Sequence, residues 1–400
     1  MLDRAQLDAL LAQPDKVVLI DVRRADEIAT VGGFPVFLNI QASELDRFLP
    51  YIPRDRRIVT ISNHAARAKA SAAVLADKGF TVAGVVGAQD YEKQGGLLYG
   101  KKIVTPDIPG VVKADTRVEV VREGFEGTEG PVALKDGTIL FTENRADRIV
   151  KIAPNGKAST FLQNTGSANA LAIGADDTLI AAQTNPAVIA VLQPTAKVLA
   201  KAYGSKPFNR PNDLAVSRAG NVYFSDPGAG GGQAAGQATR QPAAPPPTPA
   251  LYWIDGKGKV TLITNEIGRP NGVALSPDEK TLYVANTAGE ALIAYTVQPN
   301  GSVSDRRDFA KLAGIEATPN GPNSGADGIV VDKDGRVYVA TNIGVQVLSP
   351  EGAALGVIAL PKKPQNLVFG GADHSRLYVV GRGSVYRIAT LTRGVDRPGK

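Results

Sequence analysis

Six residues with side-chain oxygen atoms recur at one position of a repeating sequence pattern. Each stands at the start of a short apolar segment, which a polar turn connects to a second apolar segment. The six are Glu129, Asn169, Asn212, Asn271, Asp327 and Asn366. Turn formation by Asn and Asp explains one or two such positions but not all six. Carboxylate and amide oxygens are the ligands of hard divalent cations, so the pattern predicts a metal site.

The pattern itself predicts the elements that position these side chains. Its copies begin about 40 residues apart, which is the length of one four-stranded propeller blade. Two longer intervals contain insertions, residues 228–250 and a second one near Ala317–Gly325. The sequence therefore predicts an all-β, six-bladed β-propeller over residues 112–396, in which an extra strand near Arg117–Val121 joins the last blade.

In such a propeller, the second apolar segment of each copy returns to the face where the six residues lie. Its end carries Glu143, Gln183, Asp226, Asn286, Thr341 and Gly381. Asp226 either faces a substrate or caps a turn. His374, the single His of the propeller, falls in a turn at the opposite end, so a Ser–His–Asp arrangement is disfavoured.

The first 103 residues have a different pattern, in which apolar strands alternate with helices. Lys16–Val22, Arg57–Ser62 and Thr81–Val86 are expected to form strands, and Ala65–Gly79 an Ala-rich helix. This predicts a small α/β domain over residues 1–103. The proline-containing residues 104–111 are expected to be a linker.

Composition limits the partners of the protein. The chain has no Cys, which excludes disulfides and thiolate catalysis and is compatible with a reducing cytoplasm, where we expect the protein. The net charge of +6 is spread without a basic stripe, so nucleic-acid binding is not expected. No apolar run approaches the roughly 20 residues of a membrane span, and the first residues resemble an amphipathic helix rather than a signal.

From about Gly124 to Ala389 the sequence resembles the SMP-30/gluconolactonase/LRE-like family. The motifs that carry the resemblance are EGP from Glu129, RPND from Arg210, RPNG from Arg269, ADG from Ala326 and NLVFGG from Asn366. The resemblance implies a six-bladed, metal-dependent lactone hydrolase. It implies calcium as the cofactor, with zinc, magnesium or manganese as substitutes.

The resemblance also implies roles for individual residues. Glu129, Asn271 and Asp327 match protein ligands of the metal, and Asn212 matches the asparagine beside metal or substrate. Asp327 also matches the residue that accepts and returns a proton. Arg210 matches an arginine for substrate oxygens, and we add Asn169 and Asp226 as substrate-binding candidates. The expected reaction is opening of a sugar lactone or related cyclic ester by metal-activated water.

The N-terminal region resembles a rhodanese domain through LIDVRRADE from Leu19, the segment IVTISNHAARA, and GAQDYEKQGG up to Gly96. Ser62 stands where active relatives carry the catalytic Cys, five residues before Arg67, so a persulfide cannot form. The loop from Ser62 to Arg67 could bind an anion at a helix N-terminus. We favour a scaffold role or self-association for this domain.

Two other functions remain open at this point. One is a non-catalytic, metal-stabilised binding or scaffold protein. The other is a hydrolase that acts on a non-sugar ester or a phosphotriester. Retention of Glu129, Asn212, Asn271 and Asp327 together favours the lactonase, with a small-molecule lactone as its partner.

Overall fold

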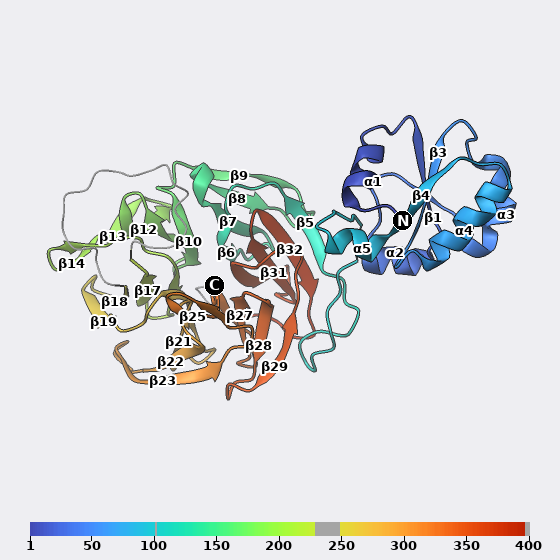
Figure 1. The fold of residues 1–400 in the computed structure, drawn as a ribbon. Coiled ribbons are helices and arrows are strands. Elements are labelled where there is room, and N and C mark those ends of the chain that lie inside the picture. The colour runs from blue at the N-terminus through green and yellow to red at the C-terminus, as the bar shows by residue number, and fades with distance from the viewer. Residues whose placement is uncertain (101, 229–248, 397–400) are drawn as a thin grey trace. The chain divides into compact units, whose positions relative to one another are not determined.

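The computed structural model describes residues 1–100, 102–228 and 249–396. The chain divides into two compact units, Met1–Ile103 and Val104–Lys400, which are treated separately below (Figure 1). Within the described residues, no helix has the length and apolar character needed to cross a bilayer.

The N-terminal unit is a four-stranded parallel sheet with helices around it. The strands occur in the order β2-β1-β3-β4, and all three pairings are parallel. They are β1 (Val17–Asp21), β2 (Leu38–Asn39), β3 (Arg57–Ser62) and β4 (Val82–Gly87). The helices are α1 (Arg4–Leu11), α2 (Ala25–Val31), α3 (Leu45–Phe48), α4 (Ala66–Asp77) and α5 (Ala88–Lys93), with 3-10 turns η1 (Ala42–Glu44) and η2 (Leu49–Tyr51).

The central strands of this sheet are apolar on both faces. In β1, Leu19 packs into one hydrophobic cluster and Ile20 into a second one, because successive side chains of a strand point to opposite faces. A fully buried ion pair follows directly: the Arg23 guanidinium donates from Nε to Asp21 Oδ1 at 2.8 Å and from Nη2 to Asp21 Oδ2 at 2.6 Å. It also donates to the Gly32 carbonyl at 2.9 Å, so the pair fixes the chain as it leaves β1.

The second unit contains six four-stranded antiparallel sheets arranged around a common centre, which confirms the predicted six-bladed propeller (Figure 1). Blade 1 is β6 (Glu129–Ala133), β7 (Ile139–Glu143), β8 (Arg148–Ile152) and β9 (Ala158–Gln163), and includes the 3-10 turn η3 (Asn144–Ala146). Blade 2 is β10 (Ala168–Ile173), β11 (Leu179–Thr184), β12 (Ala187–Gln193) and β13 (Lys197–Ala200). Blade 3 is β16 (Leu214–Val216), β17 (Val222–Asp226), β18 (Ala250–Ile254) and β19 (Val260–Thr264).

The remaining blades follow in chain order. Blade 4 is β20 (Pro270–Leu275), β21 (Thr281–Asn286), β22 (Ala291–Val297) and β23 (Val303–Lys311). Blade 5 is β26 (Ile329–Val331), β27 (Val337–Thr341), β28 (Gly344–Leu348) and β29 (Ala354–Ile358). Blade 6 is β30 (Asn366–Gly370), β31 (Arg376–Gly381), β32 (Ser384–Ala389) and β5 (Glu119–Glu123).

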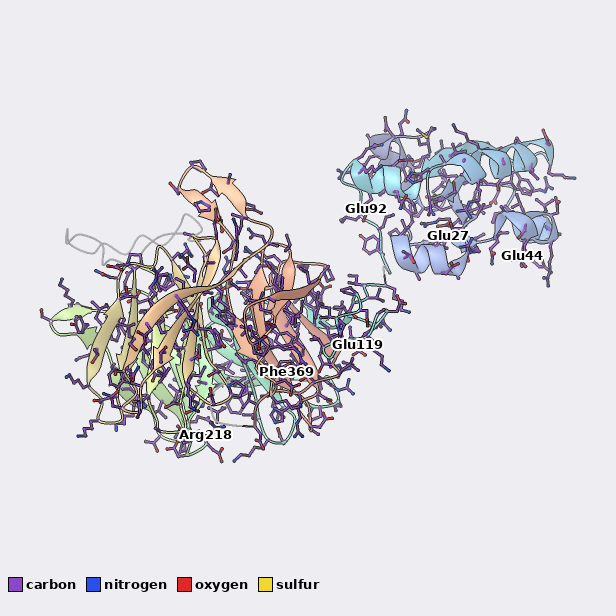
Figure 2. The ribbon with its side chains drawn as sticks, turned by 90° about the horizontal axis from the view of Figure 1, so that it is seen from below. Glu27, Glu44, Glu92, Glu119, Arg218 and Phe369 are labelled. Atoms are coloured by element: carbon purple, nitrogen blue, oxygen red, sulfur yellow. The ribbon has the colours of Figure 1, made fainter. Side chains whose placement is uncertain are left out.

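The ring closes in blade 6, where β5 pairs antiparallel with β32, as expected for the strand near Arg117–Val121. Arg387 Nε donates to Glu119 Oε2 at 2.8 Å across this pair (Glu119 is labelled in Figure 2). Strands from the two ends of the propeller sequence therefore share one sheet.

Hydrophobic clusters between neighbouring blades hold the ring together. In β21, Leu282 and Val284 pack into the cluster shared with blade 3, whereas Tyr283 and Ala285 pack into the cluster shared with blade 5. Because successive side chains of a strand point to opposite faces of the sheet, β21 contributes to the interfaces with both neighbouring blades. In each blade, side chains that alternate between the two faces pack against the two neighbouring blades.

Several connecting segments have more structure than the sequence predicts. The expected linker, residues 104–111, lies in the second unit, where Ile108 and Val111 are fully buried and the Val111 carbonyl accepts a hydrogen bond from the Leu391 amide at 2.8 Å. The insertion near Ala317–Gly325 contains a hairpin of β24 (Glu316–Thr318) and β25 (Gly321–Asn323), and a second hairpin pairs β14 (Ala202–Tyr203) with β15 (Lys206–Pro207). Most of the other predicted insertion, residues 229–248, lies outside the described residues.

Candidate functional site

The six oxygen-bearing residues stand at the beginnings of the six innermost strands, β6, β10, β16, β20, β26 and β30. Equivalent strands surround the propeller axis in the same direction, so these residues form one ring at one end of it. We call this set, Glu129, Asn169, Asn212, Asn271, Asp327 and Asn366, the axial ring. Four of its members are at most 5% exposed: Glu129, Asn169, Asn271 and Asn366.

Hydrogen bonds connect the axial ring from blade to blade on one side. Asn144 Nδ2 of blade 1 donates to Asn169 Oδ1 at 2.9 Å, and Asn169 Nδ2 donates to the Asn212 carbonyl at 3.1 Å. Ser225 Oγ of blade 3 then donates to the Asn271 carbonyl at 2.6 Å. Each contact fixes the entry of one inner strand against the blade before it.

The other side of the axial ring is connected in the same way. The Gly272 amide of blade 4 donates to the Asp327 carbonyl at 3.1 Å, and the Gly328 amide of blade 5 donates to the Gln365 carbonyl at 2.7 Å. Gln365 Nε2 of blade 6 returns to Glu129 Oε1 of blade 1 at 2.9 Å. A continuous series of hydrogen bonds therefore runs around all six blades.

Glycine residues allow this close approach of the inner strands. A β-carbon at position 272 would lie 2.1 Å from the Asp327 carbonyl oxygen, and one at position 328 would lie 2.2 Å from Asn366 Oδ1. Gly130, with φ of +43°, leaves a β-carbon only 2.2 Å from the Ala170 Cα. Each glycine follows a ring residue directly, so the EG, NG and DG pairs of the motifs have a steric cause.

The residues at the ends of the second strands brace the ring within each blade. Glu143 Oε1 accepts from the Glu126 amide at 2.7 Å, and Gln183 Nε2 donates to the Thr165 carbonyl at 2.7 Å. Asn286 Oδ1 accepts from the Arg269 amide at 3.1 Å. These contacts hold the main chain two to four residues before the ring residue of the same blade.

Asp226 belongs to this bracing set. Its Oδ2 accepts from the Asn209 amide at 2.8 Å and its Oδ1 from the Arg210 amide at 2.9 Å. The Asp226 carboxyl is 3% exposed, and burial raises its pKa while the amide donors oppose the rise. These contacts match the turn-capping alternative, because they fix the loop that carries Arg210 and Asn212.

The donor set of the axial ring fits a hard cation. Asn271 Nδ2 donates to Thr287 Oγ1 at 3.1 Å, whereas its buried Oδ1 accepts no hydrogen bond from any residue that the structure describes. A buried amide oxygen without a donor is costly, by about 1–3 kcal/mol, and a cation ligand is one way to satisfy it. Across the described ranges no three His, Asp or Glu side chains gather as a ligand group, so the predicted set relies on two carboxylates and two amides.

The Asp327 carboxyl is partly buried, and its environment raises the pKa to about 7. Burial is the largest cause, and the charge of Asp213 acts in the same direction. The positive charges of Lys363, Arg269 and Arg382 lower the pKa and offset part of the rise. Both carboxyl burial and nearby cations are therefore features of this end of the propeller.

Sequence reasoning missed several residues at this site. Gln365 connects blades 6 and 1, Thr287 holds Asn271 and donates to the Ala326 carbonyl at 2.6 Å, and the charge of Lys363 lowers the pKa of Asp327. Gln365 directly precedes a ring residue, which is the one signal that the repeat offers. Thr287 lies in the turn between β21 and β22 and Lys363 in the connection between blades 5 and 6, so both fall outside the aligned parts of the repeat copies.

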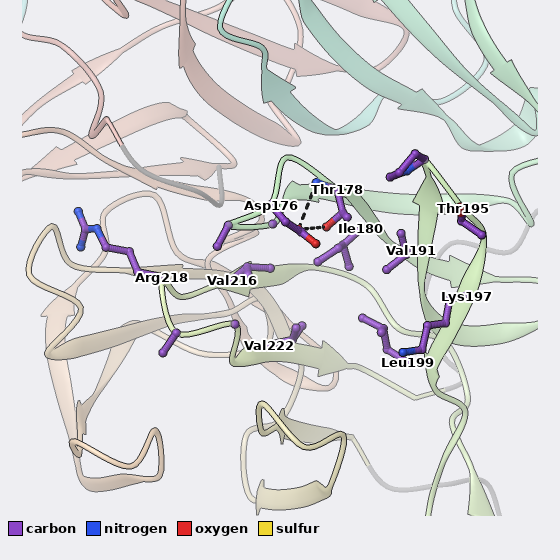
Figure 3. Close-up of a pocket in the computed structure, with 15 residues that line it drawn as sticks. Asp176, Thr178, Ile180, Val191, Thr195, Lys197, Leu199, Val216, Arg218 and Val222 are labelled. Carbon is purple, nitrogen blue, oxygen red and sulfur yellow. Dashed lines mark hydrogen bonds between the residues drawn. The ribbon is translucent and has the colours of Figure 1, made fainter.

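A separate cavity of about 520 Å³ is lined by residues of blades 2 and 3 (Figure 3). Its apolar floor includes Ile180, Val191 and Val222, and Asp176 stands at its edge in the turn between β10 and β11. That turn is at the opposite end of β10 from Asn169, so the cavity is not the predicted site. His374, also expected at that end, lies in the turn between β30 and β31.

The loop from Ser62 to Arg67 of the N-terminal unit is internally paired. Arg67 donates to both oxygens of Glu27, at 2.8 and 2.5 Å, and holds the pKa of that carboxyl at about 2 (Glu27 is labelled in Figure 2). Ser62 Oγ accepts from the Ala68 amide at 3.2 Å, and His64 Nδ1 lies 3.4 Å from Asp90 Oδ1. The Arg67 charge is thus balanced within the domain.

Relatives of known sequence and structure share the propeller. A gluconolactonase of Zymomonas mobilis is 28% identical over 316 residues, which cover 72% of this chain and 86% of that protein. A lactonohydrolase of Aspergillus oryzae is 28% identical over 203 residues, covering 47% of this chain and 45% of that protein. The structure of a gluconolactonase from Xanthomonas campestris superposes with a TM-score of 0.60 at 25% identity, covering 73% of this chain and 98% of that one.

The family assignment rests on a family model that matches more than half of the chain. Residues 127–382, which span the propeller from β6 to the end of β31, match the family model of the SMP-30/gluconolactonase/LRE-like region. This range contains every member of the axial ring. The chain therefore belongs to the SMP-30/gluconolactonase/LRE-like family.

Proposed function

We propose that the protein is a metal-dependent hydrolase that opens the ring of a sugar lactone or a related cyclic ester. The observation that carries the proposal is the buried, donor-free Oδ1 of Asn271 in a ring that also contains two carboxylates. The lactonase names of relatives in the same family support the reaction class.

Glu129, Asn271, Asp327 and Asn212 are the residues that would hold the cation, and an all-oxygen set favours calcium over zinc, magnesium or manganese. When bound, a divalent cation supplies Lewis-acid polarisation of the lactone carbonyl and lowers the pKa of a water molecule. Glu129 accepts hydrogen bonds from Gln365 and Asn366, which orient its carboxylate at the axial ring.

Asp327 is proposed as the proton carrier. Attack of water on the carbonyl carbon requires removal of a proton, and breaking of the ring C–O bond requires a proton on the leaving oxygen. Asp327 would accept the first proton and return it to the ring oxygen. Arg210 and Asn212 would hold substrate oxygens, Asn169 would line the site beside them, and Asp226 would position the loop before Asn212.

The test begins with protein stripped by a chelator and refilled separately with calcium, magnesium, manganese or zinc. Proton release is then measured on aldonolactones and on simple γ- and δ-lactones, and metal binding is measured by calorimetry. We expect turnover that metal restores and that Asp327→Ala abolishes. The control Asp177→Asn changes an exposed carboxylate, 65% accessible, in the turn between β10 and β11 and is expected to behave as the unchanged protein.

Two outcomes would contradict the proposal. Tight metal binding without turnover of any lactone would favour a non-catalytic, metal-stabilised binding protein or a hydrolase of phosphotriesters and other esters. Full metal-dependent activity in Asp327→Ala would remove Asp327 from the mechanism.

For the N-terminal unit, we propose a rhodanese-like fold that no longer transfers sulfur and instead mediates self-association. The edge strand β2 exposes Leu38, at 41%, and the nearby Val36 is 79% exposed. Exposed apolar side chains beside an open strand edge favour pairing between chains. Sedimentation of the full chain should show a dimer that Val36→Glu weakens, and a monomer at all concentrations would contradict this role.

A further inference from the structure

Blade 6 brings two cationic side chains to the end of the propeller that carries the axial ring. Lys363 lies in the connection between β29 and β30, three residues before Asn366. Arg382 lies in the turn between β31 and β32. Neither position belongs to the repeat pattern, and neither has a role in the proposed hydrolysis.

The Lys363 ammonium is held in place by its neighbours. Its Nζ donates to Asn342 Oδ1 at 2.5 Å, and a β-carbon at Gly325 would lie 2.6 Å from the same Nζ. The ammonium therefore lies over the chain two residues before Asp327. Its charge acts on the Asp327 carboxyl, and burial lowers the pKa of Lys363 itself.

Arg382 is attached to the axial ring through Gln365. The Arg382 amide donates to Gln365 Oε1 at 2.8 Å, and Gln365 Nε2 donates to Glu129 Oε1 at 2.9 Å. Gln365 thus fixes the turn of Arg382 relative to a proposed metal ligand. The Arg382 side chain is exposed, and its charge also acts on Asp327.

Lys363 and Arg382 form no direct ion pair among the residues that the structure describes, although the charges of Asp327 and Glu316 act on Lys363. Neither side chain lies within ion-pair distance of a carboxylate in residues 1–100, 102–228 or 249–396, which are the residues that the structure describes. The adjacent Lys362, in contrast, forms an ion pair with Glu123 at 2.9 Å. A divalent cation held by Glu129 and Asp327 would engage the carboxylate that acts most on Lys363 and leave the weaker influence of Glu316. A neutral sugar lactone would bring no anionic group to the partly buried Lys363 ammonium, whereas an anionic one would give it a direct charged partner.

We propose that the lactone opened at this site carries an anionic group, such as a phosphate, sulfonate or carboxylate, that Lys363 and Arg382 bind. A lysine ammonium serves as a point charge for such an anion, and an arginine guanidinium can donate two parallel hydrogen bonds to it. This inference rests on the proposed lactonase function and adds the charge class of its substrate.

The test compares an aldono-1,5-lactone phosphorylated at C6 with its unphosphorylated parent on the metal-loaded, full-length protein. We expect a higher kcat/KM for the phosphorylated lactone, through a lower KM, and a decline of that preference as ionic strength rises. Lys363→Gln and Arg382→Gln should each reduce the preference about fivefold, the value for one charge contact near 4 Å in a well-solvated site. Lys362→Gln, which removes the neighbouring charge, should leave the preference unchanged.

A direct binding measurement separates this inference from the proposed function. Calorimetry compares glucitol 6-phosphate with glucitol, neither of which contains a lactone ring. If no lactone is hydrolysed but the phosphate binds in a manner that depends on Lys363, the hydrolase proposal is wrong and the anion site stands. If neutral and phosphorylated ligands bind and react equally well, or if Lys363→Gln and Lys362→Gln behave alike, the anion site is overturned.

Discussion

Substitution Gly272→Ala tests whether close contact between inner strands holds the candidate site together. The Gly272 amide donates to the Asp327 carbonyl at 3.1 Å, and an added β-carbon would lie 2.1 Å from that same oxygen. It would also lie 2.9 Å from the Gly328 Cα. Both obstacles are backbone atoms, so no side-chain rotation can relieve the overlap.

The size of the effect follows from this geometry. Separation of the two strands by about 1 Å would break the Gly272–Asp327 hydrogen bond, worth about 0.5–1.5 kcal/mol, and overpacking adds about 1–3 kcal/mol. We therefore expect a loss of roughly 2–4 kcal/mol in the free energy of unfolding. For a unit of this size that corresponds to a Tm lower by roughly 4–16 °C. A displacement of Asp327 by about 1 Å should also reduce kcat/KM for lactones by about 100-fold.

The single Trp of the chain provides the assay. Trp253 lies on β18 in the propeller, so its fluorescence reports unfolding of that unit and not of the N-terminal one. The matched control is Gly256→Ala in the turn after β18, where the nearest atom to a new β-carbon, the Ala219 carbonyl oxygen, is 3.7 Å away. The reasoning is refuted if Gly272→Ala melts at the temperature of the unchanged protein and binds metal with the same affinity.

Three further predictions concern charge. In metal-free protein the pKa of Asp327 is raised from 3.8 to about 7, so the free energy of unfolding should fall as pH rises from about 4 through 7. Over the same range the stabilisation by added calcium should grow, because calcium binds the ionised carboxylate. Equal calcium-induced Tm shifts at pH 5 and at pH 8 would contradict this prediction. The Glu27 pKa is lowered from 4.5 to about 2 by its ion pair with Arg67. The pair is worth about 0.5–1 kcal/mol because Arg67 is partly exposed. It therefore stabilises the N-terminal unit above pH 4.5, and this contribution is lost as pH falls toward 2. Glu27→Gln should flatten that acid limb in circular dichroism at 222 nm, since the described α-helices all lie in Met1–Ile103, and an unaltered pH profile would refute the assignment. Asp226→Ala should raise KM more than it lowers kcat, because the loop before Asn212 loses two amide contacts, and steady-state kinetics in which kcat alone falls would assign Asp226 to the chemistry instead.

The propeller could be predicted from sequence because the strands and turns of each repeat follow from the order of apolar and polar residues within that repeat. Alternation in β21 shows which side chains enter the two interblade clusters, and the Asn–Gly and Asp–Gly pairs mark where inner strands meet. The strand Arg57–Ser62 of the N-terminal unit was also predictable, as a short β-branched run. These features depend on neighbours close in sequence.

The remaining features depend on contacts between distant segments. Lys363 reaches the axial ring because the Gly381 backbone approaches the Lys363 carbonyl, so closely that a β-carbon at Gly381 would lie 2.5 Å from that oxygen. Residues 104–111 resemble a linker by their prolines, yet Ile108 packs against Gly356 of β29, about 250 positions later in the sequence. The amino-acid composition of residues 104–111 predicts a flexible segment, but it does not show which distant residues pack against that segment in the folded chain.

Closure of blade 6 has a consequence for synthesis of the chain on the ribosome. Glu119 and Arg387 pair across 268 positions, so β5 emerges early and β32 emerges last among the propeller strands. Blades 1 to 5 can form in order as they leave the exit tunnel, but the ring stays open until translation passes β32. Until then β5 has no partner strand, and the Gln365–Glu129 contact beside the axial ring is absent. Binding of the proposed metal ion should therefore require that translation has passed β32, because one of its proposed ligands gains its last neighbouring blade only then.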